Sequence, residues 1–156
     1  MTYVFDNSPL SVLFRNFYRS RFPTLWAQFD ALVDQGRILS TREALREIED
    51  GASDECRVWA AQNSALFASP TGAEGAFVAR IFAVPHFQQN IEQRKILQGG
   101  KNADPFVIAR AAIANATVVT MESLRPNGAG IPNICDHFNV PWLSLEQFME
   151  AEGWTF

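Results

Sequence analysis

The sequence predicts a three-layer α/β fold with a mostly parallel central sheet. Short apolar stretches of strand character alternate with longer stretches in which apolar residues recur at helical spacing. The clearest strand, 116–121 (ATVVTM), is β-branched and apolar on both faces, which is typical of a strand buried inside a parallel sheet. The sequence shows no internal repeat and no low-complexity tract, so we expect a single domain over residues 1–156.

The first half of the chain is expected to combine short strands with several helices. The expected strands are 2–5 and 37–39, and the expected helices are 10–18, 22–36, 40–49, 54–67 and 71–82. The first strand leads into a loop at Ser8–Pro9. Ser40 is placed to cap the helix that follows it, with Glu43 completing a capping box. Thr71 and Glu74 have the same spacing at the start of a later helix.

The second half of the chain is expected to alternate loops with regular elements. We expect an exposed polar loop at 86–102, a helix at 104–113, the strand at 116–121, a loop at 128–132, a strand at 140–143 and a terminal helix at 144–153. Asp104 is placed as the N-cap of its helix, because Pro105 follows at the first helical position. The alanines of that helix indicate close packing on the sheet.

The composition is that of a folded cytoplasmic protein. Hydrophobic residues make up 47% of the chain and charged residues 19%, and no apolar run approaches the roughly 20 residues that cross a bilayer. The start MTYVFDNSPLS lacks the basic and apolar regions of a signal peptide, so we expect a cytoplasmic location and no membrane partner. Cys56 and Cys135 lie in unrelated contexts, which gives no basis for a disulfide.

The net charge of −4 argues against a nucleic-acid partner, because phosphate binding usually calls for excess Lys and Arg. Two details weaken this objection. Four of the seventeen acids are candidates for a metal site, where bound cations would offset their charge. Eleven of the thirteen basic residues are Arg, whose planar guanidinium group binds phosphate in a bidentate manner.

Four carboxylates are expected to meet at one edge of the sheet, and they are called the four acids below: Asp6, Glu47, Asp104 and Glu122. Asp6 and Glu122 each follow a strand, and ligand sites in parallel sheets form at the carboxyl ends of strands. The helix that Asp104 opens runs back antiparallel, so its N-terminus faces the same edge. Glu47 lies two turns into the helix after the second strand, from where it can reach this edge. Hard carboxylate oxygens favour Mg²⁺ or Mn²⁺, which would activate a water molecule for phosphoryl chemistry.

Each of the four acids also has a simpler explanation. Asp6 fits an ordinary turn residue after a strand, and Asp104 fits an N-cap. Glu122 and Glu47 both fit solvated positions. Glu43 is already explained by its capping box, although it stays open as an alternative to Glu47 for the second acid. The convergence of the four on one edge, more than any single residue, indicates a site.

Four segments resemble the acidic motifs of PIN domains, in the same order along the chain. They are YVFDNS at 3–8, the segment 41–48, KNADPFVIARAA at 101–112 and VVTMES at 118–123. The closing segment IPNICDHFNVPWLSLEQFM also resembles the tail of PIN domains. The resemblance covers essentially the whole chain and is nearest to an uncharacterised bacterial PIN-like family related to VapC-type toxins.

This resemblance implies a Mg²⁺- or Mn²⁺-dependent endoribonuclease that acts as the toxin of a bacterial toxin–antitoxin pair. By the same resemblance the four acids are catalytic residues and metal ligands, and Ser8 supplies the hydroxyl that follows the first acid. We expect Asn7, Lys101 and Asn102 to contact the substrate together with Ser8. The implied partners are an RNA substrate, a cognate antitoxin protein and, as in many such toxins, a second copy of the chain. One departure is Glu122, since the fourth position is usually Asp.

Two other functions stay open on the sequence alone. The first is a PIN-like protein that is catalytically weak and acts through partner binding. The second is an acidic-site α/β phosphatase, which would begin with a strand and D-x-D; Ser8 stands where the second Asp would be, which counts against this class.

The remaining candidate motifs are expected to be structural. Cys135 beside Asp136 and His137 does not indicate a thiol nucleophile, because neighbours in sequence rarely point at each other. His86 is expected at the surface. The segment 128–130 (GAG) is too short for a phosphate loop and does not open a helix. The arginines between 15 and 21 lie among aromatic residues, which fits a single-strand binder or an ordinary helix end.

Overall fold

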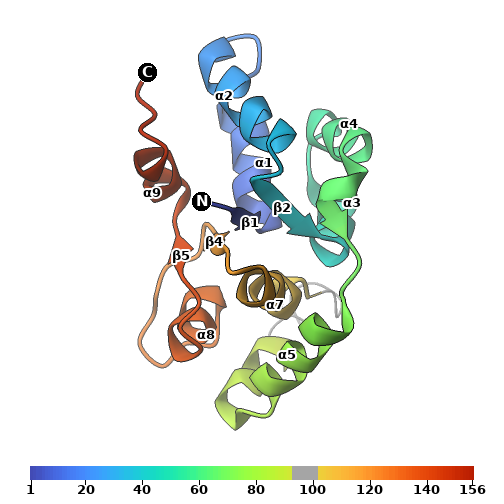
Figure 1. The fold of residues 1–156 in the computed structure, drawn as a ribbon, viewed down its shortest axis with the longest axis vertical. Helices are drawn as coiled ribbons and strands as arrows, with labels where there is room; N and C mark the ends of the chain where they lie inside the picture. The colour runs from blue at the N-terminus through green and yellow to red at the C-terminus, as the bar shows by residue number, and fades with distance from the viewer. Residues whose placement is uncertain (93–101) are drawn as a thin grey trace.

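The centre of the molecule is a five-stranded sheet whose strand pairs are all parallel (Figure 1). A computed structural model describes residues 1–92 and 102–156. The strand order is β3-β2-β1-β4-β5. The strands are β1 (Tyr3–Phe5), β2 (Ile38–Thr41), β3 (Phe67–Ala68), β4 (Thr117–Val119) and β5 (Trp142–Leu143). The predicted α/β class with a parallel sheet is therefore confirmed.

Helices link the strands and cover both faces of the sheet (Figure 1). They are α1 (Asn7–Asn16), α2 (Pro23–Asp34), α3 (Arg42–Gly51), α4 (Asp54–Gln62), α5 (Gly72–Phe82), α7 (Asp104–Ala114), α8 (Ile131–His137) and α9 (Leu145–Ala151). Short 3₁₀ turns lie at Ser64–Leu66 and Pro85–Phe87, and residues 88–92 are helical. Within the two described ranges, no helix is both long and apolar enough to cross a membrane.

Strand β1 lies between two hydrophobic cores. Tyr3 and Phe5 pack in the core formed with α1, α2, α4 and α9, whereas Val4 packs in the core formed with α5, α7 and α8. All three side chains are fully buried. Because successive side chains of a strand point to opposite faces of a sheet, a central strand in a three-layer fold needs apolar residues at every position. This requirement explains the uninterrupted apolar run that ends at Asp6.

Two local predictions near the start of the chain are wrong. Ser8–Pro9 is part of the first turn of α1 and not a loop; proline is tolerated there because first-turn N–H groups have no intrahelical partner. Helix α3 is capped by Thr41, whose hydroxyl accepts the N–H of Ala44 at 3.1 Å. Ser40 belongs to β2 and donates to the Phe5 carbonyl oxygen at 2.7 Å, so the predicted Ser40 capping box is wrong.

The remaining local predictions have mixed outcomes, because tertiary packing sets boundaries that local sequence does not show. The capping box of Thr71 and Glu74 is confirmed. The helix predicted at 54–67 ends at Gln62, and the short strand β3 follows. The segment 128–130 does open a helix, because Gly130 is the N-cap of α8. The predicted loop at 86–102 is wrong for its described first part, which is largely helical and buries Phe87.

Candidate functional site

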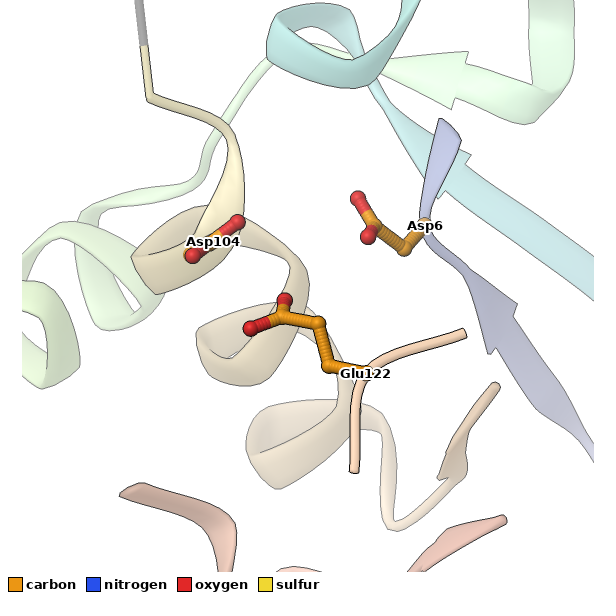
Figure 2. A group of neighbouring side chains, drawn as sticks. All are labelled: Asp6, Asp104 and Glu122. Atoms are coloured by element: carbon orange, nitrogen blue, oxygen red, sulfur yellow. The ribbon is translucent and has the colours of Figure 1, made fainter. Parts of the chain in front are cut away.

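Three carboxylates meet at the carboxyl-terminal edge of the sheet, beside β1 and β4. Asp6 directly follows β1, Glu122 lies in the segment after β4, and Asp104 is the first residue of α7. One oxygen atom from each lies within 4.8 Å of the other two. Figure 2 shows the three side chains extending from separate elements toward a common space. This edge is a topological switch point, since the chain continues from β1 to β2 on one side while β4 lies on the other.

The Asp6 carboxyl group is deeply buried in this cluster. Its residue is 3% exposed, and its Oδ1 atom is buried without a hydrogen-bond partner among the residues that the structure describes. Burial raises the pKa of Asp6 well above its usual range, and the carboxylates of Asp104, Glu47 and Glu122 raise this pKa further. A buried carboxylate without compensation is costly. Three convergent carboxylates with one such oxygen fit a hard divalent cation such as Mg²⁺ or Mn²⁺.

Asp104 is held by side-chain amides and is not the cap of its helix. Ala103 is the N-cap residue, so the predicted capping role of Asp104 is wrong. The backbone N–H of Asp104 donates to Asn102 Oδ1 at 3.2 Å. The Asp104 Oδ2 atom accepts from Asn90 Nδ2 at 3.0 Å. The Asp104 carboxylate therefore contacts Asn90 and belongs to the acidic cluster.

Glu47 lies at the margin of the cluster and organises its surroundings. Its Oε2 atom accepts from Asn7 Nδ2 at 2.5 Å, and its Oε1 atom accepts from the backbone N–H of Ala103 at 2.9 Å. Glu47 is close enough to raise the pKa of Asp6, but it is outside the set of three whose oxygens converge within 4.8 Å. A direct role for Glu47 as a metal ligand stays a prediction.

Glu43, the alternative second acid, is engaged elsewhere. Its Oε1 atom accepts from the guanidinium group of Arg42 at 3.1 Å. Among the described residues, the carboxylates that raise the pKa of Asp6 include Glu47 and not Glu43. The geometry therefore favours Glu47 as the α3 acid that acts on the cluster.

Residues 3–156 match the protein family described as "Domain of unknown function (DUF4411)". The chain belongs to the DUF4411 family. None of the functionally curated proteins matches its sequence.

Among solved structures, the DUF4411 chain is similar in fold to a chain of VapBC2 from Rickettsia felis, in a crystal structure of that complex bound to a DNA fragment from its promoter. The TM-score is 0.51 at 14% sequence identity, over 92% of this chain and 98% of that chain. At this identity the likeness concerns the fold alone. The architecture is thus a parallel α/β sheet flanked by helices, similar to the PIN-like VapC fold.

Three of the four residues predicted to contact substrate, Asn7, Ser8 and Asn102, lie around the acids of this DUF4411 chain. Asn7 and Ser8 line an open pocket of about 570 Å³ beside Glu47. Asn102 donates to Asn90 Oδ1 at 2.6 Å in addition to holding the N–H of Asp104, so its amide supports the cluster. Lys101 lies outside the described residues. Substrate contact by these side chains stays a prediction.

Two residues around the cluster were not indicated by the sequence. Asn90 is 3% exposed and contacts Asp104, but it lies in a stretch whose polar composition favoured an exposed loop. Gly130 lies against Glu122: a Cβ atom at this glycine would be 2.6 Å from Glu122 Oε1. Only an apolar residue at helical spacing before Asn90, namely Phe87, could have indicated that the stretch is buried.

The other candidate residues from the sequence are buried or make contacts that support the fold. Cys56 and Cys135 are buried free cysteines, and burial raises the pKa of both thiols, that of Cys56 to about 11. A thiol with a raised pKa is a poor nucleophile at neutral pH. Arg19 forms an ion pair with Asp30 at 3.1 Å. His86 Nε2 lies 3.1 Å from the carbonyl oxygen of Gly128 and so contacts the loop before α8.

Proposed function

We propose that this DUF4411 protein is a divalent-metal-dependent nuclease that cleaves RNA internally. One observation carries the proposal: three carboxylates from separate elements converge within 4.8 Å, and one of their oxygens, Asp6 Oδ1, is buried without a hydrogen-bond partner in the described part of the chain. When bound there, Mg²⁺ or Mn²⁺ would supply the charge that stabilises the reacting phosphate and activates water.

The acids of the chain would have different roles around this cation. Asp6, Asp104 and Glu122 would hold it, since each directs an oxygen atom into the same space. Glu47 fixes the start of α7 through the N–H of Ala103 and adds negative charge next to Asp6. Asp6 and Asp104 would hold the cation firmly, because both side chains are buried where β1 ends and where α7 begins.

Two open pockets adjoin the cluster and support a strand-shaped substrate. One, of about 570 Å³, includes Arg15, and the other, of about 420 Å³, includes Arg125. The two pockets share Met121, and the second also includes Glu122. A strand lying through both would place one arginine on each side of the acids, and guanidinium groups bind phosphates in bidentate fashion. These arginines would supply phosphate contacts near the acids despite the net charge of −4.

We extend the proposal to a toxin with a cognate antitoxin partner. The support is the PIN-like fold shared with a chain of the VapBC2 complex, which was crystallised on DNA from its promoter. A homodimer belongs to the same extension. Co-expression of the chain with the product of the adjacent gene, followed by purification on a single tag, tests the partner; the extension predicts a stoichiometric complex in which RNA cleavage is suppressed.

The test of the nuclease is cleavage of single-stranded RNA by the purified chain in Mn²⁺, in Mg²⁺ and in EDTA. We expect internal cleavage that requires the cation and that is lost in Asp104→Asn, with native circular dichroism. Metal binding without cleavage would instead indicate a protein that acts through partner binding. Hydrolysis of a small phosphomonoester with transfer of phosphate to Asp6 would indicate the phosphatase.

A further inference from the structure

We propose that Asn90 is a positioning residue that fixes Asp104 and Glu122 relative to each other so that their carboxylates suit a divalent cation. This inference rests on the proposed metal-dependent function and concerns how the same site is built. Asn90 lies in the helical stretch 88–92 and is 3% exposed, so its side chain is fixed within the protein and not at its surface.

The first part of the argument is the direct contact with Asp104. Asn90 Nδ2 donates to Asp104 Oδ2 at 3.0 Å. A hydrogen bond donated to a carboxylate is charge-assisted. The contact fixes the rotation of the Asp104 carboxylate, which determines where its second oxygen points. A hard cation binds best to carboxylate oxygens that are already oriented toward it.

The second part is an indirect contact with Glu122. The same Asn90 Nδ2 atom donates its other hydrogen to the carbonyl oxygen of Ala129 at 2.9 Å. Ala129 precedes Gly130, and a Cβ atom at Gly130 would lie 2.6 Å from Glu122 Oε1. The backbone at Gly130 therefore packs directly against the Glu122 carboxylate. Because Asn90 binds both Ala129 and Asp104, it fixes the distance between this backbone and Asp104.

The third part is the orientation of the Asn90 amide itself. Its Oδ1 atom accepts from Asn102 Nδ2 at 2.6 Å, so the nitrogen faces Asp104 and Ala129 while the oxygen faces Asn102. Both N–H hydrogens and the oxygen of Asn90 thus have partners. A buried amide with all its groups satisfied is a rigid link. Leucine has the same branching and number of side-chain heavy atoms as asparagine but can make none of these hydrogen bonds, so it removes all three at once.

The experiment measures Mn²⁺ affinity of the full chain by titration calorimetry. Asn90→Leu should bind Mn²⁺ at least about tenfold more weakly than the wild type, since loss of a group that orients a metal ligand costs about 10- to 100-fold. Asn102→Ala removes the donor to Asn90 Oδ1 and the acceptor of the Asp104 N–H, and it should weaken binding about two- to fivefold. The control is Asn63→Ala, since Asn63 Nδ2 donates to the Trp59 carbonyl oxygen at 2.9 Å, at the end of α4 and away from the acids. Its affinity should be unchanged.

A merely structural role for Asn90 would lower the melting temperature in EDTA and leave the Mn²⁺ affinity of the folded protein intact. Folded Asn90→Leu with wild-type affinity would therefore overturn the inference. If Asn90→Leu does not fold, Asn102→Ala decides, and an unchanged affinity in that variant overturns it. Wild-type protein that binds Mn²⁺ but does not cut RNA contradicts the nuclease and leaves this test in force. Wild-type protein that does not bind Mn²⁺ overturns both.

Discussion

Two acidic regions of the described structure differ in whether their carboxylates are exposed and paired or buried together. The outer acidic groove, a pocket of about 710 Å³ lined by α2 and α4, contains Asp30, Asp34, Asp54 and Glu55. Two of its acids form ion pairs, Asp30 with Arg19 and Asp54 with Arg57, and the side chains of Asp30 and Asp54 are 45% and 93% exposed. The acidic centre, made of Asp6, Asp104 and Glu122, instead contains Asp6 at 3% exposed.

This difference shows that a count of acids does not identify a metal site. Exposed carboxylates are hydrated and screened, and their ion pairs contribute about 0–1 kcal/mol. A buried carboxylate that faces other carboxylates is unfavourable until a proton or a cation joins it. The comparison therefore predicts that variants and metal ions act strongly at the acidic centre and weakly in the outer acidic groove.

The largest effect is expected for Asp6→Asn. Cleavage of RNA should fall by about 10²-fold or more, because several kcal/mol of transition-state stabilisation by the cation are lost. The melting temperature of the metal-free protein should rise, because the variant removes a buried charge that neighbouring carboxylates repel.

The matched control is Asp30→Asn in the outer acidic groove. It should change stability by less than about 1 kcal/mol and leave cleavage intact, because it removes only an exposed ion pair. Equal effects of the two substitutions on cleavage would remove the distinction between the two regions.

The next largest effect is expected in the dependence of folding stability on pH. The pKa of Asp6 is higher in the folded than in the unfolded chain, where it is about 3.9, so folding favours the protonated form. The stability from this group is fully present below the unfolded pKa and is lost as pH rises through the folded pKa. Melting curves in EDTA should therefore show a decrease in stability from acidic to neutral pH that is weaker in Asp6→Asn. A steeper decrease in the variant would refute the assignment of this proton to Asp6.

Metal should reverse this loss. At about 100 times its Kd, Mn²⁺ adds about 2.7 kcal/mol to the free energy of unfolding by binding only the folded state. For a chain of 156 residues this corresponds to a rise in melting temperature of about 5–10 °C. An identical curve with and without Mn²⁺ at neutral pH would exclude a metal site at the acidic centre.

A smaller effect separates the two glutamates of α3. Glu47→Gln should reduce cleavage about tenfold, because it removes a charge next to Asp6 and weakens the contact with the N–H of Ala103. Glu43→Gln should leave cleavage within about threefold and cost about 1 kcal/mol, since it weakens the contact with Arg42 and no capping box is lost. The opposite ranking would shift the second acidic motif by one helical turn.

Sequence reasoning succeeded where strand ends alone determine a position. Asp6 and Glu122 follow strands, so parallel strand order was enough to bring them together. It failed where a distant segment supplies the partner. At the start of α7, the backbone N–H of Asp104 donates to Asn102. The backbone N–H of Ala103 donates to Glu47, and these two residues are 56 positions apart in the sequence. Such pairings follow from packing, which no local pattern records.

The same reason explains why the surroundings of the acids were misjudged. The stretch before residue 93 is polar, and its buried Asn90 contacts distant segments at Asp104 and at Ala129. At Gly130, the N-cap of α8, the Glu122 carboxylate occupies the space that a side chain would need. Both facts depend on long-range contacts between segments whose local sequence favours loops.

The smallest effect is expected on RNA binding, where two arginines of the same region, Arg15 and Arg19, should differ. Arg15 is exposed and lines the pocket that contains Asn7 and Glu47. Arg19 is fixed by its ion pair with Asp30 at 3.1 Å and lies 4.3 Å from the centre of the Trp26 ring. A guanidinium group held by a carboxylate and an aromatic face has its charge already satisfied, whereas one in an open pocket is available to a phosphate.

Arg15→Ala should therefore weaken RNA binding severalfold and reduce the salt dependence of affinity by about one charge, with unchanged melting temperature. Arg19→Ala should do the reverse: it should cost about 1 kcal/mol of stability through the lost ring and ion-pair contacts and leave the salt dependence alone. Both are measured by fluorescence anisotropy with labelled RNA over a salt series, in the Asp6→Asn background so that the RNA stays intact. The control for that background is Asp6→Asn alone. If both arginines contribute equally to the salt slope, RNA does not follow the pocket beside Glu47, and the path through Met121 between the two pockets is wrong.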